Sequence, residues 1–226
     1  MAERHNLFEF PHKSFRFMWM EVVSVAGTTN AGDDASLEQL EAKVDFAVDA
    51  YAHHNHDESS WFAPRLAEID KDLAARWIHD HDEHEHVLHS LRERAHAIRA
   101  ERDGAARSAK LRDFYRFACR FLADDLDHMA LEQEAIMTAF QNAYTDDQLR
   151  QLEGQFVAER IDPAYMKTLT PLFLRACNID ERTLLLSLVQ KQSPSPEAFQ
   201  GLLNGLVASI VPAGELAQIR GRLGVV

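Results

Sequence analysis

The sequence predicts an all-α protein, an up-down-up-down four-helix bundle followed by a helical C-terminal extension. Apolar residues recur at alternating spacings of three and four along four long stretches, which is the period of a helix with one buried face. The 226 residues include only nine glycines and seven prolines, and β-branched runs are scarce. We therefore expect a four-helix bundle over residues 1–143 and a helical extension over residues 144–226.

The first two helices are separated by a loop rich in glycine and aspartate. Pro11 suits the first turn of a helix, and Gly27 is expected to end that helix. Ser36 and Gln39 have the spacing of a capping box, so we expect the second helix to begin there. Pro64 is expected to kink the second helix or to end it near residue 63.

The remaining helices are delimited by similar signals. A turn near Ile69–Asp70 precedes the third helix, and Asp103–Gly104 separates it from the fourth. The extension is expected to form several shorter helices that pack on the bundle or on a second copy of the chain. Its predicted helix boundaries are Thr145, Asp162–Pro163, Asn178–Asp180, Ser195–Pro196 and Pro212.

Composition excludes several classes of protein. The formal net charge of −12 argues against nucleic acid and anionic membranes as partners, because both require a basic surface. Two cysteines, Cys119 and Cys177, cannot build a disulfide framework or a four-cysteine metal site. The sequence shows neither a long apolar span nor a signal peptide, so a cytoplasmic protein is the expectation.

Polar residues occupy several positions on the apolar face of the predicted helices, which we call the seam, where a helical core needs apolar residues. His54 and Glu58 are four residues apart on the second helix, and His128 and Glu132 repeat this spacing on the fourth. Two side chains at this spacing project from one face of a helix, about one turn apart. Burying a carboxylate without a partner is very costly, whereas carboxylate and neutral imidazole together are good metal ligands.

The first and third helices each add one histidine, and a test of depth joins the four helices. In an up-down bundle, two residues on neighbouring helices lie level when they are equally far from the connecting turn. Taken in chain order, the four histidines are His12, His54, His84 and His128. The midpoints between successive members fall at residues 33, 69 and 106, and each lies in or beside an expected loop. The sequence therefore predicts a two-metal site in one layer, with six ligands: His12, His54, Glu58, His84, His128 and Glu132.

Several assignments have alternatives. His54 is preferred to His53 because it continues the apolar seam, and His84 is preferred to His81, although both lie on the third-helix seam. His81 is then either an additional ligand or a residue that orients one. Asp125 either orients an imidazole or belongs to a buried polar network. The alternative for the whole set is a group of satisfied polar residues in the core.

Four segments resemble the hemerythrin-like, or HHE cation-binding, family, in its bacterial type with four histidine and two glutamate ligands. The match extends over roughly residues 8–140, and the segments that carry it are Pro11-His12-Lys-Ser-Phe-Arg16, His54-Asn-His-Asp-Glu58, Asp82-Glu83-His84-Glu85 and His128-Met-Ala-Leu-Glu132. The resemblance implies a non-haem di-iron centre and carries over the same six ligands. Iron is preferred to zinc or manganese on this ground alone. The invertebrate oxygen carriers have five histidines, so simple oxygen transport is not implied.

Three functions are compatible with such a site. The first is binding of oxygen or nitric oxide at an open coordination position, in sensing, storage or stress response. The second is a di-iron enzyme, either a peroxidase or oxidase or a protein for repair of iron centres, and the sequence leaves enzymatic activity undecided. The third is an interaction module whose metal state changes the packing of the C-terminal helices, which could also form a homodimer.

Overall fold

The computed structural model describes residues 4–225, which form helices and the loops between them, without any strand. The chain divides into two compact units, residues 1–160 and residues 161–226. The first unit is thus longer than the bundle expected from the sequence, because one further helix belongs to it. None of the described helices is long and apolar enough to cross a membrane.

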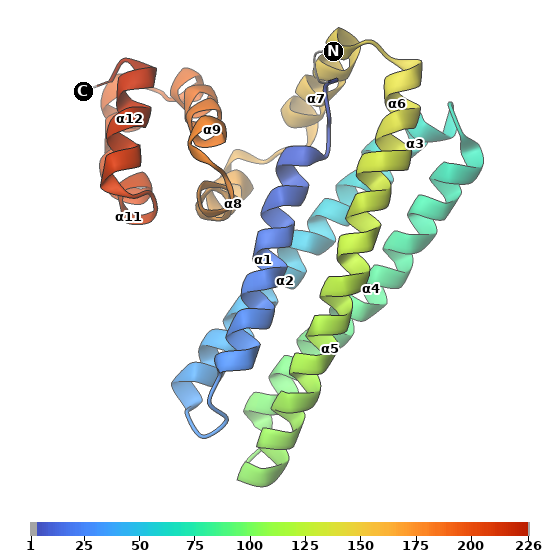
Figure 1. Cartoon of the computed structure of the whole chain (residues 1–226), viewed down its shortest axis with the longest axis vertical. Coiled ribbons are helices and arrows are strands. Elements are labelled where there is room, and N and C mark those ends of the chain that lie inside the picture. The colour runs from blue at the N-terminus through green and yellow to red at the C-terminus, as the bar shows by residue number, and fades with distance from the viewer. Residues whose placement is uncertain (1–3, 226) are drawn as a thin grey trace. The chain divides into compact units, whose positions relative to one another are not determined.

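Four long helices of the first unit lie side by side (Figure 1). Helix α1 packs against α2 and α5, and α4 packs against the same two helices from the other side. The helices of this unit have the following bounds: α1 Glu9–Thr28, α2 Asp34–Asp57, α3 Ala63–Ala67, α4 Lys71–Ala100, α5 Gly104–Leu131, α6 Met137–Ala143 and α7 Asp146–Arg160.

The start of α2 corrects one prediction. The side chain of Asp33 accepts a hydrogen bond from the Ala35 N–H and a second one from the Ser36 hydroxyl, so Asp33 is the N-cap. The helix thus begins two residues before Ser36, because the carboxylate of Asp33 satisfies a free backbone donor of the first turn. Helix α1 likewise begins at Glu9, and Pro11 lies within its first turn.

Other boundaries agree with the sequence. Asp70 is the N-cap of α4 and Asp103 that of α5. Thr145 and Gln148 form the expected capping box before α7, in which the backbone N–H of each donates to the side chain of the other. The guanidinium of Arg107, a buried residue of α5, donates a hydrogen bond to the carbonyl of Ala31 at 3.3 Å. This bond connects α5 to the loop after α1.

Two π-helical turns interrupt the helices. One, η1, spans Glu58–Phe62 between α2 and α3, and the other, η2, spans Glu132–Ile136 between α5 and α6. The turn η1 is the interruption expected near Pro64, since a wider turn relieves the clash of the proline ring with the preceding turn. Both π-helical turns begin at the glutamate of a His-x3-Glu pair, and such turns often mark functional sites.

Apolar side chains surround the level at which these glutamates lie. One buried cluster joins the residues just before α1 with η1, α3, α4, η2, α6 and α7, and it includes Phe8, Phe62, Trp77 and Phe140. Trp61, Phe62, Trp77 and Phe121 are buried. A polar group between the four helices is therefore shielded from water by aromatic residues.

The second unit has a core of its own. Its helices are α8 (Pro163–Ala176), α9 (Ile179–Gln192), α10 (Pro196–Leu202), α11 (Ala208–Ile210) and α12 (Ala213–Leu223), with a π-helical turn η3 (Leu203–Val207). The core includes Leu174, Leu186, Phe199, Leu203 and Ile219. Asn178 caps α9 in a capping box with Glu181. The boundaries of α8, α10 and α12 lie at the prolines that predicted them.

Candidate metal centre

Six buried or nearly buried side chains form two groups that could each hold a metal ion. The first group is His12, His54 and Glu58, and the second is His81, His128 and Glu132. Within each group, one potential ligand atom of each residue lies within 4.8 Å of the others. The residues come from α1, α2, α4 and α5 and from the first residue of each π-helical turn, so all four long helices contribute.

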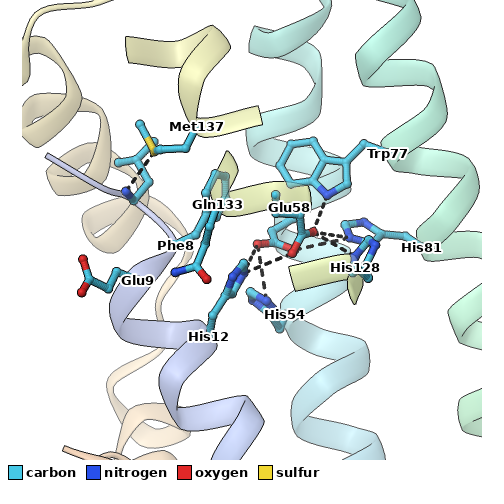
Figure 2. Close-up of polar contacts among 12 residues, drawn as sticks. Phe8, Glu9, His12, His54, Glu58, Trp77, His81, His128, Gln133 and Met137 are labelled. Atoms are coloured by element: carbon cyan, nitrogen blue, oxygen red, sulfur yellow. Dashed lines mark hydrogen bonds and ion pairs between the residues drawn. The ribbon is translucent and has the colours of Figure 1, made fainter. Parts of the chain in front are cut away.

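The carboxylate of Glu58 lies between the two groups (Figure 2). Its Oε1 is 3.4 Å from the Nε2 atom of His12 and 3.4 Å from the Nε2 atom of His54. Its Oε2 is 3.4 Å from the Nε2 atom of His81, which belongs to the second group. One carboxylate therefore presents one oxygen to each group.

Glu132 repeats this arrangement from the opposite side. Its Oε1 is 2.9 Å from the Nε2 atom of His128 and 3.2 Å from that of His81. Its Oε2 is 3.3 Å from the Nε2 atom of His12, in the first group. The two glutamates thus form a pair of bridges between two pairs of histidines, which is the arrangement of carboxylate-bridged dinuclear centres in helical bundles.

These distances suit ligands of a common ion better than direct hydrogen bonds. Two ligand atoms each about 2.1 Å from a metal ion are separated by roughly 3.0 to 3.4 Å in octahedral or tetrahedral geometry. Several of the nitrogen–oxygen contacts fall in this range. The Nε2 atoms of His54 and His128 and one oxygen of each glutamate are buried without forming a hydrogen bond within the described part of the chain.

Burial keeps the histidines of the first group in the form that binds metals. Desolvation by burial lowers the pKa of His12 to about 4, although the charge of Glu132 opposes this effect. Desolvation likewise lowers the pKa of His54 well below its usual range. Both imidazoles are therefore neutral near pH 7 and have a lone pair for a metal ion. The residues present fit a metal centre.

The two carboxyl groups behave differently from each other without metal. Burial and the charge of Glu132 raise the pKa of Glu58 well above its usual range. Burial would also raise the pKa of Glu132, but the charge of His12 and the close contacts of His128 and His81 outweigh it and hold this pKa well below its usual range. Ions bound to both carboxylates would favour the ionised form of each.

Neighbouring side chains orient the ligands. The Oγ of Ser59 lies 2.8 Å from the Nδ1 of His81, on the side of the ring away from the carboxylates. If His81 binds a metal through Nε2, its Nδ1 carries the proton and donates to Ser59. The indole N–H of Trp77 donates to Oε1 of Glu132. No motif or spacing in the sequence indicated that Ser59 or Trp77 would contact a ligand.

Of the two third-helix histidines, the structure brings His81, and not the predicted His84, together with the other candidate ligands. His81 is 4% exposed and belongs to the second group, whereas His84 lies outside both groups. The ring of His84 contacts the ring of His128 edge-on, with 4.5 Å between centroids. His81 is three residues nearer the turn before α4, level with the glutamates, whereas His84 lies nearer the level of His54. The other five predicted ligands lie together.

The residues near the site include two further groups that the sequence left open. Asp125 belongs to a buried network, since it accepts a hydrogen bond from the Tyr51 hydroxyl. Burial raises the pKa of Asp125 to about 7, in spite of this hydrogen bond. His53 faces Asp57 at 3.3 Å, outside the two groups. Asp57 is buried, and Arg160 at the end of α7 contacts it at 3.3 Å.

A third group of potential ligands lies on the surface and differs in character. Glu41, Asp45 and His96 are half-buried or exposed, and their charges are already paired. Arg92 contacts Asp45 at 3.2 Å, and Arg99 contacts Glu41 at 2.7 Å. These contacts explain the cluster as surface ion pairs across α2 and α4.

Fold and site together define a helical protein with two adjacent buried groups of histidine and glutamate that could hold metal ions. No family model, no curated protein and no solved structure matches the chain. The function must therefore be argued from the geometry of the site itself.

Proposed function

We propose that this protein is a hemerythrin-like di-iron protein that binds oxygen or a related small ligand such as nitric oxide. Its first unit would be an up-down-up-down four-helix bundle, with the two ions between the helices. The observation that carries the proposal is the pair of bridging glutamates: Glu58 and Glu132 each present one oxygen to each pair of histidines. A single mononuclear site would not need this double bridge.

The proposal assigns three kinds of role to the chain. His12 and His54 would bind one ion, and His81 and His128 the other, in each case through Nε2. The glutamates would bridge the two ions and balance part of their charge. Six protein ligands cannot saturate two octahedral ions, so coordination positions stay open for a small ligand.

The surroundings keep water away from this centre. His12 and Glu132 are each 0% exposed, and Phe8 stacks on the His12 ring with 5.4 Å between centroids. Ser59 holds the His81 ring in place, and Trp77 donates to Glu132. Iron would supply the reversible one-electron chemistry that oxygen binding needs. The preference for iron over zinc or manganese comes from the family resemblance, since imidazole and carboxylate ligands suit several metals.

Metal analysis of the full-length protein, purified after expression in iron-rich medium, tests the proposal. We expect about two irons per chain and ligand-to-metal absorption bands that shift when azide or nitric oxide is added. Glu58→Ala should lose most of the bound metal. His86→Ala is the matched control, because His86 is exposed on α4, and it should retain both ions.

Two results would overturn the proposal. Iron near zero in the wild-type protein would exclude a di-iron centre. Full metal content in Glu58→Ala would exclude the bridging role of this glutamate. Two zinc or manganese ions in place of iron would keep the dinuclear site but exclude the binding of oxygen by iron.

A further inference from the structure

The two sides of the candidate centre differ in chemistry. On one side the histidines meet aromatic groups of the apolar cluster around Phe8 and Trp77. Phe8 stacks on His12, and the Trp77 ring lies 5.5 Å from the His81 ring. The only polar atom that Trp77 offers is its indole N–H, and this donates to Glu132. This side is filled by ligands and apolar rings.

The other side carries polar groups that are not ligands of either group. Tyr51 lies 5.6 Å from the ring of His54, and His84 lies 4.5 Å from the ring of His128. Tyr51 and His84 also approach each other, with 6.4 Å between ring centroids. Together they link the first histidine pair to the second. Asp125 joins them through its hydrogen bond from Tyr51.

Two polar atoms on this side are buried without a hydrogen-bond partner in the described residues. One is Nδ1 of His84, and the other is Oδ2 of Asp125, a residue that is 0% exposed. The Tyr51 hydroxyl already donates its proton to the other oxygen of Asp125, so it cannot donate a second bond. Buried polar atoms are almost always paired, and an unpaired one costs free energy. Such atoms beside an open metal centre indicate a polar ligand.

We propose that small ligands bind the dinuclear centre on the side of His84 and Asp125, and that the imidazole of His84 donates a hydrogen bond to them. The inference rests on the proposed function, because it needs the two ions in place. It also names the ligand class: small hydrogen-bond acceptors such as azide and peroxide are preferred to nitric oxide.

The preference follows from the strength of the hydrogen bond. A bond from His84 to a ligand that carries negative charge is stronger than one to a nearly neutral ligand, and burial strengthens it further. A ligand with a proton of its own, such as hydrogen peroxide, could also donate to Oδ2 of Asp125. Nitric oxide is a weak acceptor and has no proton, so it gains little from either group.

The experiment compares ligand affinity in four forms of the metal-loaded full-length protein: wild type, His84→Leu, His86→Leu and His84→Gln. His84→Leu removes the hydrogen-bond donor and puts an apolar side chain of moderate size in its place. His86→Leu, at an exposed position of the same helix, is the matched control. Azide and nitric oxide are titrated separately by absorption, and metal content is measured in each sample.

We expect His84→Leu to keep both ions and to bind azide at least about tenfold more weakly than wild type, which corresponds to about 1.4 kcal/mol. Its affinity for nitric oxide should change less than about threefold, and His86→Leu should match wild type for both ligands. His84→Gln, which retains an N–H donor, should recover part of the azide affinity.

Three results would overturn the inference. Unchanged azide affinity in His84→Leu would show that His84 does not contact the ligand. An equal loss of affinity for azide and nitric oxide would remove the preference for hydrogen-bond acceptors. Loss of an ion in His84→Leu would make His84 a metal ligand instead. By contrast, a wild-type protein that lacks two ions would overturn the proposed function itself, independently of these variants.

Discussion

Replacing Glu132 by glutamine removes a charge at the point where the two candidate ion positions meet. The carboxylate of Glu132 lies within 3.3 Å of three imidazole nitrogens, from His12, His81 and His128. Glutamine keeps the size of the side chain and one oxygen that can accept from Trp77. The substitution therefore changes the charge and the second ligand oxygen with little change in packing, and both ions should bind more weakly.

The size of the effect follows from the linkage between binding and stability. A hundredfold weaker affinity for one ion, at the same excess of metal, reduces its contribution to the free energy of unfolding by about 2.7 kcal/mol. For a protein of 150 to 250 residues this lowers the Tm by roughly 5 to 10 °C.

The assay is thermal unfolding with added metal and again with a chelator, so that only the metal-dependent difference is compared. Glu134→Gln is the control, since Glu134 lies on the same π-helical turn but is exposed, and it should behave as wild type. A Glu132→Gln protein that keeps the full metal-dependent rise in Tm and both ions would refute the bridging role of this carboxylate.

Two further predictions concern the neighbours of the ligands. Ser59→Ala removes the hydrogen-bond partner of the His81 ring and should weaken metal binding by roughly 10- to 100-fold, whereas Ser59→Thr should keep most of the affinity. Competition with a chelator of known affinity measures the metal affinity of each variant. Equal affinities in Ser59→Ala and wild type would contradict the prediction. In the metal-free protein, burial lowers the pKa of His84 from 6.5 to about 4, so the unfolded chain binds more protons in this interval and the free energy of unfolding falls as the pH falls. His84→Leu should make this fall shallower by up to about one proton per molecule. Urea unfolding across the same pH interval tests it, and an unchanged pH dependence would show that His84 is not protonated on unfolding.

The sequence by itself determined the helices and most of the candidate ligands. A spacing of four residues places His54 beside Glu58, and His128 beside Glu132, in any α-helix, because this follows from helix geometry alone. Seam position then indicated which of the neighbouring histidines His53 and His54 faces inward. Helix ends were also predictable. The predicted start of α2 was wrong by two residues, because Asp33 and Ser36 are both suitable capping residues.

Only the tertiary structure decided between His81 and His84. The midpoint between His54 and His84 falls at the turn near Ile69–Asp70, but the midpoint between Glu58 and His81 falls there as well, so depth alone fits either choice. The choice depends on whether the centre lies at the level of the histidines or of the glutamates. The structure places it at the glutamates, where the carboxylate of Glu58 and the hydroxyl of Ser59 both reach His81. Such contacts join residues on different helices, and their formation depends on how the helices pack, which the spacing within one helix does not specify.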